Sequence, residues 1–312
     1  MDHLLWFLAL CLIKFLQALP LRWVARLGRA GGALAYCVDV RHRRVAIENL
    51  NRCFASEKSP SEIRSIAREH FKRLGENYAC AIKTAGMQWA QLQKHLDFAG
   101  LEKLPPNKAV GMNWVIAIGH FGNFELYARA NHLFPGFQFA TTYRALKQPA
   151  LNKLLVELRT RSGCLVFERR QENEALRNAM NSGGLMLGFL SDQNAGTGGA
   201  WIPFFGQSCS TTIAPAVFAL RYKAPLYTAI CYRIGLAQWR IEAGNAIATQ
   251  ENGQRRSSEE IMLDVNRAFE TAIRRDPANW FWVHKRWKPK QSKTRPAKAP
   301  IRQTAAMLGR EG

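Results

Sequence analysis

Short apolar runs alternate with amphipathic segments from residue 110 to residue 275. The apolar runs are predicted to form strands at residues 110–118, 136–146, 164–168, 185–194, 225–234 and 238–244. The amphipathic segments are predicted to form helices at residues 125–132, 148–163, 173–184, 214–224 and 258–275. This alternation indicates an α/β fold with a mainly parallel central sheet that helices cover on both faces.

The part of the chain before this alternation is predicted to be helical from residue 21 to residue 100. The segment at 60–85 shows the pattern best, because it begins with Pro-Ser-Glu and then places Ile63, Ile66 and Phe71 at roughly helical spacing. The sequence contains no internal repeat and no long low-complexity linker.

The N-terminus carries an apolar run from Leu4 to Leu19 that only Lys14 and Gln17 interrupt. A transmembrane helix needs about 20 apolar residues. This run is shorter, so it is predicted to be a marginal span or a helix lying in the membrane interface, with a buried core helix as the alternative. The arginines that follow favour the membrane, as on a cytoplasmic flank that faces anionic lipid: Arg22, Arg26, Arg29, Arg41, Arg43 and Arg44.

The overall charge is strongly positive, with a formal net charge of +21 at pH 7 and a pI of about 10.2. Such a charge favours polyanionic partners, namely nucleic acid, anionic lipid or an acidic carrier protein. The seven cysteines include no C-x-x-C pair, so neither a zinc site nor a disulfide framework is expected, and the thiols are predicted to be reduced and mostly buried.

The chain is accordingly divided into an N-terminal membrane-associated helical region at 1–20, a main domain at 21–288 and a basic tail at 289–312. From residue 285 onward the sequence is rich in Lys, Arg, Pro and Gln, and this end is predicted to be disordered.

Polar residues follow three of the predicted strands at the point where each strand ends. They are His120, Arg144 and Asp192. Parallel sheets gather functional groups at the carboxyl ends of their strands. The three loops are therefore predicted to line one crevice.

His120 and Glu125 form an H-x4-E pair at a strand-to-helix junction. If the helix begins near Asn123, the carboxylate can turn back toward the imidazole, hold one ring nitrogen as N–H and leave the other free as a base. The acceptor's own hydroxyl would then be the nucleophile. The alternative is a turn histidine followed by a glutamate that the helix dipole favours.

Residues 119–128, GHFGNFELYA, resemble the catalytic motif of the bacterial lipid A biosynthesis acyltransferases, a lauroyl/myristoyl-transferase family within the lysophospholipid acyltransferase-like superfamily. Four other segments resemble blocks of the same family in the same order. They are RHRRVAIENLNRCFA (41–55), TYRALKQPALNKL (142–154), LSDQNAGTGGAWIPFFGQSCSTT (190–212) and DPANWFWVHKRWK (276–288).

This resemblance implies an O-acyltransferase in which His120 is the general base and Glu125 orients and polarises it. The acceptor hydroxyl would attack an acyl thioester, and the backbone N–H groups of Gly122 and Asn123 would stabilise the resulting oxyanion. Neither a metal nor a cofactor is expected.

The resemblance also places substrate-binding residues in two loops. Arg144 and Lys147 are predicted to grip phosphate on the acceptor or on the donor's phosphopantetheine arm, with solvated surface charges as the alternative. Asp192 and Gln193 follow a buried strand, where burying a polar side chain costs free energy unless it makes hydrogen bonds or serves a function. The alternative for this pair is a simple turn before the glycines of GTGG.

Two aromatic stretches leave alternatives open. Phe204-Phe205-Gly206 is interpreted either as the wall of an acyl tunnel or as core packing. Trp280, Trp282 and Trp287 interleave with the basic residues at 284–286, a pattern that favours a membrane interface or structural packing over stacking on single-stranded nucleic acid.

The expected partners are an acyl carrier protein as acyl donor, with acyl-CoA as the alternative donor, an anionic glycolipid as acceptor and the membrane. The catalytic domain is expected on the cytoplasmic side of a bacterial inner membrane. An acceptor such as a mannosylated lipid or a lysophospholipid is an alternative. A basic nucleic-acid-binding protein is a further alternative, although no helix-turn-helix, zinc finger or RNA-binding aromatic motif supports it; nucleic acid is therefore not expected as a partner.

Overall fold

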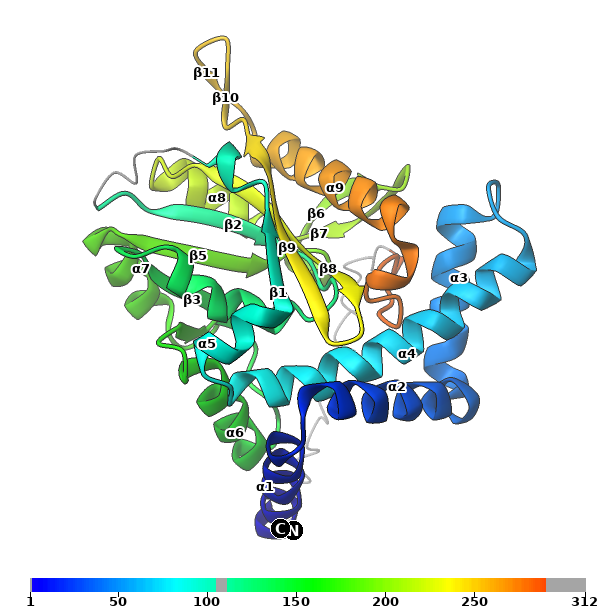
Figure 1. The fold of residues 1–312 in the computed structure, drawn as a ribbon. Helices are drawn as coiled ribbons and strands as arrows, with labels where there is room; N and C mark the ends of the chain where they lie inside the picture. The colour runs from blue at the N-terminus through cyan, green and yellow to red at the C-terminus, as the bar shows by residue number, and fades with distance from the viewer. Residues whose placement is uncertain (1, 105–110, 290–312) are drawn as a thin grey trace, which may run out of the picture.

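The computed structural model describes residues 2–104 and 111–289 and shows a seven-stranded sheet flanked by helices (Figure 1). The sheet order is β1-β9-β8-β2-β5-β3-β4, and every neighbouring pair is parallel except β8–β9. Its strands are β1 (Leu96–Ala99), β2 (Trp114–Ile118), β3 (Gln138–Tyr143), β4 (Leu165–Glu168), β5 (Leu185–Leu190), β8 (Leu226–Gly235) and β9 (Gln238–Ile247). The predicted α/β class with a mainly parallel sheet is confirmed.

Two small antiparallel hairpins lie outside this sheet. They are β6 (Ala200–Phe204) with β7 (Gln207–Thr211), and β10 (Gln250–Glu251) with β11 (Gln254–Arg255). Neither hairpin was predicted.

The α-helices are α1 (Asp2–Ala18), α2 (Leu21–Val38), α3 (Val40–Phe54), α4 (Pro60–Ala85), α5 (Trp89–Leu92), α6 (Pro149–Thr160), α7 (Asn173–Ser182), α8 (Ala214–Arg221) and α9 (Ser258–Arg275). The 3-10 helices are η1 (Gln93–His95), η2 (Leu101–Lys103), η3 (Phe124–Leu133), η4 (Gly196–Gly198) and η5 (Pro277–Asn279).

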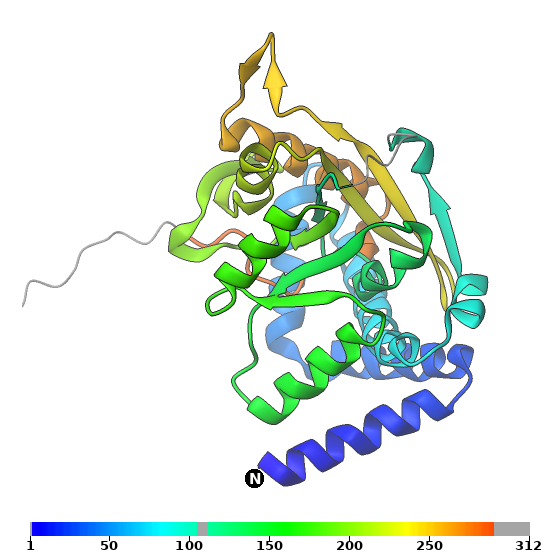
Figure 2. The same ribbon diagram turned by 90° about the vertical axis from the view of Figure 1, so that its left-hand side faces the viewer.

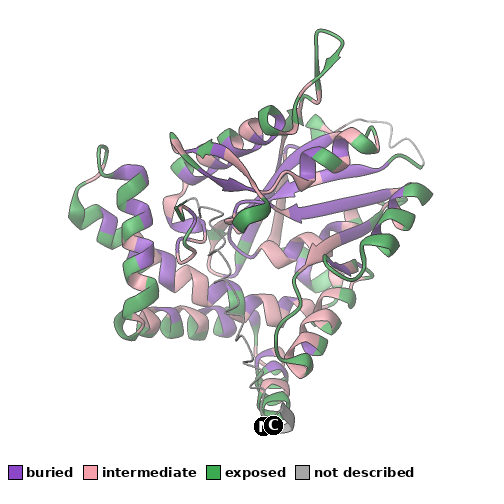
Figure 3. Cartoon of the chain, turned by 180° about the vertical axis from the view of Figure 1, so that it is seen from behind, coloured by how far each residue is buried: buried purple, intermediate pink, exposed green. Residues whose placement is uncertain are grey.

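The two faces of the sheet carry different packing, because side chains alternate along each strand. Val115 and Ala117 of β2 pack in the main core with residues of α7, α8 and α9. Trp114 and Ile116 point to the opposite face, where η3 covers the sheet. Figure 3 shows the inner strands of the sheet buried along their length. β2 is buried on both faces, as expected of a central parallel strand.

The long helix α4 connects the N-terminal helices to the sheet domain. Its N-terminus is a capping box, in which the Ser59 hydroxyl accepts from the Glu62 amide and the Glu62 carboxylate accepts from the Ser59 amide. α2 packs along α4 so closely that a Cβ at Gly32 would come within 2.1 Å of the Phe71 carbonyl oxygen. Glycine is therefore required at that contact.

Three predictions about secondary structure need correction. Leu96–Ala99 is the strand β1 rather than helix. The segment at 125–132 forms a 3-10 helix, η3, instead of an α-helix. Arg286 belongs to the folded domain and is fully buried, donating to the Ser210 carbonyl and to the Thr211 hydroxyl, so the prediction of disorder from residue 285 is wrong at this position. Residues 290–312 of the predicted tail lie outside the described residues.

The N-terminal region forms a helix, α1, at the edge of the molecule beside α4 and α6 (Figures 1 and 2). In the described ranges, no helix has both the length and the apolar content that crossing a bilayer demands.

Candidate active site

His120 and Asp192 meet at the carboxyl end of the sheet because their strands are neighbours in register. β2 and β5 are parallel, and Ile118 pairs with Leu190 at their ends. Each site residue lies two positions beyond its paired residue. The His120 Nδ1 atom lies 2.7 Å from the Asp192 Oδ1 atom, although 72 residues separate them in the chain. The loops of His120 and Asp192, two of the three loops predicted to line one crevice, therefore meet at one site.

The Asp192 carboxylate is fully buried, and both of its oxygens have polar partners. Oδ2 accepts the backbone N–H of His120 at 2.8 Å and the indole N–H of Trp280 at 2.6 Å, while Oδ1 faces the imidazole. Burial alone would raise the pKa of Asp192, but the charge and hydrogen bonds of His120 and the indole of Trp280 outweigh it, so the pKa is lowered. An ionised carboxylate can only accept, so Nδ1 of His120 carries the proton.

His120 is held so that its second ring nitrogen remains available. The imidazole packs against Phe124, with ring centroids 4.8 Å apart, and against Phe281 at 5.7 Å. Its side chain is 14% exposed and lines two cavities that open beside η3. Because Asp192 fixes Nδ1 as the protonated nitrogen, Nε2 has a free lone pair and can act as a base.

The predicted contact of Glu125 with His120 is not formed. Glu125 instead makes a bidentate ion pair with Arg159 of α6, in which Nε of Arg159 lies 2.8 Å from Oε2 and Nη2 contacts Oε1. A planar guanidinium matches a carboxylate better than one imidazole nitrogen does. Asp192 therefore holds the imidazole, and Glu125 remains nearby, lining both cavities that His120 lines.

The predicted oxyanion donors are also engaged elsewhere. The Gly122 amide donates to the Asn279 carbonyl at 3.0 Å, and the Asn123 amide donates toward the buried Cys231 thiol. Gly122 has a φ of +51°, and a Cβ there would lie 2.5 Å from the Cys231 carbonyl oxygen. This turn needs glycine for its shape, and its amides serve the fold instead of an oxyanion.

An apolar cavity extends from this site between the sheet and η3. It holds about 1020 Å³ of space between atoms, including its mouth. Its walls are mainly aliphatic and aromatic, among them Trp114, Ile116, Ile118, Phe124, Tyr127, Phe134, Met186, Leu190, Tyr227 and Ile241. Such a lining suits an apolar ligand. Glu125 and Arg159 are its charged members, and they also line the cavity that contains His120.

Comparison with known sequences agrees with this arrangement. The sequence model of the bacterial lipid A biosynthesis acyltransferases matches residues 2–289. The chain belongs to this family.

Relatives of this acyltransferase match most of its length at modest identity. The lipid A biosynthesis palmitoleoyltransferase of Escherichia coli (strain K12) is 26% identical over 285 residues, which cover 86% of each chain. The lipid A biosynthesis acyltransferase of Shigella flexneri gives the same values. That of Haemophilus influenzae is 24% identical over 313 residues, 95% of this chain and 94% of the relative.

Of the remaining predicted site residues of the acyltransferase, one lies beside the His120–Asp192 pair and two lie at the surface. Gln193 lines the same cavity as His120. Arg144 and Lys147 are exposed in the loop after β3, and neither belongs to the lining of the described cavities. The structure therefore groups His120, Asp192 and Gln193 and leaves the two basic residues at the surface.

Sequence reasoning missed two residues of the acyltransferase that contact the site, Trp280 and Arg159. Trp280 donates to Asp192 from 88 residues away, and Arg159 sits in the last turn of α6. The only sequence signal for Trp280 was the aromatic block at 276–288. Trp280 and Trp282 are buried, and Phe204 stacks on Trp287, so these aromatics pack in the core, and Trp280 in addition contacts the site.

His284 lies close to the pair but takes no part as a base. Its Nε2 accepts the Asn194 amide at 3.0 Å, and burial is the main cause that lowers its pKa to about 4. Asn49 of α3 donates to the carbonyls of Trp282 and His284, both at 2.8 Å, and so fixes this segment of the acyltransferase. Among the described residues, no group of three or more His, Cys, Asp and Glu is placed to hold a metal ion.

Proposed function

We propose that the protein moves a fatty acyl chain from an acyl carrier protein thioester to a hydroxyl of a lipid A-type glycolipid precursor. The observation that carries this proposal is the pair of His120 with the buried Asp192, which lies beside an apolar cavity. Family membership supports the reaction class and the type of acceptor. The cavity offers an apolar place for the acyl chain next to a base.

The reaction needs one base and no protein nucleophile. Nε2 of His120 takes the proton from the acceptor hydroxyl while its oxygen attacks the thioester carbonyl carbon. A C–O bond forms, the C–S bond breaks, and the proton passes from the imidazolium to the departing thiolate. Asp192 stabilises the imidazolium during the step, as a buried carboxylate does for a base it orients.

The charged groups around the pair would guide the substrates. Glu125 and Arg159 line both the apolar cavity and the space beside His120, so this ion pair would position the thioester between them. Arg144 and Lys147, exposed beyond the carboxyl end of β3, would bind the phosphates of the acceptor or of the donor's prosthetic arm. The net charge of +21 would attract both an acidic carrier protein and an anionic glycolipid.

A transfer assay tests the function. Purified protein is mixed with a lipid A precursor and a labelled palmitoleoyl thioester, a chain chosen from the name of the Escherichia coli relative. Label is expected on the glycolipid, faster from acyl carrier protein than from coenzyme A because the carrier is the larger polyanion. Label that appears only on a lysophospholipid or a mannosylated lipid would assign another acceptor, and no transfer to any of them would refute the proposal.

We also propose that α1 and α2 dock the protein on the cytoplasmic face of a bacterial inner membrane. Leu4, Phe7 and Phe15 of α1 are 63%, 57% and 56% exposed, and Trp23 and Leu34 of α2 are 56% and 63% exposed. Singly exposed apolar residues are ordinary, but a concentration of this size marks an interaction surface. Arginines flank it, as expected for anionic lipid.

Vesicle binding tests the docking. Replacing Phe7 and Phe15 by serine is expected to lower co-sedimentation with vesicles of anionic phospholipid at least several-fold. Each substitution removes about 2 kcal/mol of the binding free energy that comes from burying the phenylalanine side chain in the membrane. The matched control is Val217→Ser, an apolar residue that is 39% exposed on α8, a helix at the opposite end of the molecule from α1 (Figure 1). Equal binding by wild type and the double variant would exclude α1 as the docking helix.

A further inference from the structure

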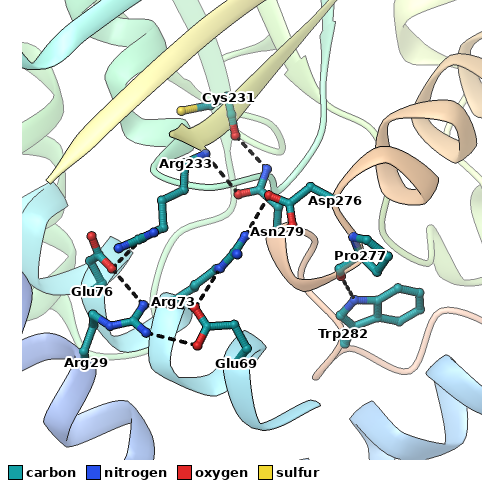
Figure 4. Close-up of polar contacts among 10 residues, drawn as sticks. All are labelled: Arg29, Glu69, Arg73, Glu76, Cys231, Arg233, Asp276, Pro277, Asn279 and Trp282. Carbon is teal, nitrogen blue, oxygen red and sulfur yellow. Dashed lines mark hydrogen bonds and ion pairs between the residues drawn. The ribbon is translucent and has the colours of Figure 1, made fainter. Parts of the chain in front are cut away.

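The segment between α9 and the C-terminal residues is fixed to the rest of the fold at several points (Figure 4). Asp276 accepts two hydrogen bonds from Arg73 of α4, at 2.7 and 2.8 Å. The Asn279 side chain donates to the Cys231 carbonyl at 2.9 Å and accepts the Arg233 amide at 3.4 Å. These contacts come from α4 and β8, so the segment at 276–282 has one defined position.

The same segment contacts the loop that carries His120. The Asn279 carbonyl accepts the Gly122 amide at 3.0 Å, and Trp280 pairs with Phe121 as an isolated antiparallel bridge. Trp280 is therefore placed by main-chain contacts with the His120 loop. Its indole is 2% exposed and packs edge-on against Trp282, with ring centroids 4.7 Å apart.

The Trp280 indole fixes the orientation of the Asp192 carboxylate. Oδ2 of Asp192 accepts two N–H groups, from the Trp280 indole and the His120 backbone, whereas Oδ1 faces the imidazole. Two donors on one oxygen hold the carboxylate plane, and the other oxygen is left for Nδ1. Without the indole, a buried ionised oxygen would lose one of its two donors, which is costly in a low-dielectric site.

We infer that Trp280 is a positioning residue for the reaction, whose indole N–H holds the Asp192 carboxylate in the orientation that serves His120. This inference rests on the proposed function, because it assumes that His120 is the base. Trp280 also lines the smaller cavity that His120 lines, so the pH dependence of the reaction is the readout that isolates its effect on Asp192.

The electrostatic surroundings of Asp192 determine what the loss of this bond should do. Besides His120, the titratable or charged groups that interact with Asp192 are Tyr127 of η3 and, from the C-terminal segment, His284 and Arg286. The indole of Trp280 is one of the groups that lower the pKa of Asp192. Its removal should raise that pKa, so the carboxylate becomes protonated, and activity is lost, at a higher pH than in the wild type.

The test compares Trp280→Phe with Trp282→Phe. Both tryptophans are buried, belong to the same segment and donate an indole hydrogen bond at 2.6 Å, but Trp282 donates to the Pro277 carbonyl. Trp282→Phe thus matches the loss of volume and of one hydrogen bond without changing Asp192. Steady-state acyl transfer is measured from pH 4.5 to pH 9, with thermal melting as a check on folding.

Trp280→Phe is expected to lower kcat about 10-fold with little change in KM, and to move the acid limb of the kcat/KM profile to higher pH. Trp282→Phe is expected to keep the wild-type acid limb. Equal losses in both variants with unmoved acid limbs would overturn the inference and leave the proposed function intact. Absence of transfer by the wild type would refute the function itself, so the two failures are distinguishable.

Discussion

Replacing His120 by alanine is expected to lower kcat for acyl transfer about 10³-fold. General base catalysis contributes about 10²- to 10⁴-fold, and among the described residues that line the cavities at the site, His120 is the histidine whose ring contacts a carboxylate. The KM for the acyl donor should change little, because the apolar cavity does not include His120. Initial rates of transfer from labelled acyl carrier protein measure the effect.

The matched control is His132→Ala. His132 stacks on Trp89, with ring centroids 4.7 Å apart, and does not line the cavities at the site. This variant should retain nearly the wild-type rate. If His120→Ala were no slower than His132→Ala, His120 could not be the base.

Replacing Glu76 by alanine is expected to reduce the free energy of unfolding by about 3–5 kcal/mol. The Glu76 carboxylate is fully buried and accepts from Arg233 at 2.8 Å and from Arg29 at 3.3 Å (Figure 4). It also accepts from the Ala237 amide at 3.0 Å. Removing one member of a buried pair leaves the partner's charge without compensation, and losses of that size are typical. Denaturant unfolding with linear extrapolation measures it.

The control for Glu76 is Glu57→Ala, which removes an ion pair at the surface. Glu57 contacts Arg274 at 2.7 Å, and both side chains are nearly half exposed. Exposed pairs contribute about 0–1 kcal/mol because water and salt screen them. If the two variants lost the same stability, the network around Glu76 would not stabilise the contact between α4 and β8.

The periodicity of the sequence was enough to predict most of the sheet and its covering helices. Buried strands appear as short apolar runs, and amphipathic helices repeat apolar residues every three to four positions. The periodicity failed for β1, a four-residue strand that directly follows the helices α5 and η1. The hairpin β6–β7 escaped prediction because Pro203 lies within its first strand, and proline argues against a strand. The helix η3 was placed correctly, but hydropathy does not distinguish its hydrogen-bond pattern from that of an α-helix.

The site was predicted in part, for a reason that the sheet makes clear. His120 and Asp192 were both identified because each follows a buried strand. The wrong partner was assigned to His120, because Glu125 is close in sequence whereas Asp192 is close only through the register of β2 and β5. Arg159 and Trp280 lie on α6 and on the segment after α9, and no pattern in the sequence ties either of them to the site.

The most direct measurement compares His120→Ala, Asp192→Asn and the double variant in one transfer assay. Asp192→Asn alone is expected to lower kcat about 10²- to 10⁴-fold, because the amide no longer stabilises the imidazolium. Since Asp192 acts only through His120, the double variant should be no slower than His120→Ala. Losses that multiply in the double variant would contradict the account, because Asp192 would then act on the reaction independently of His120.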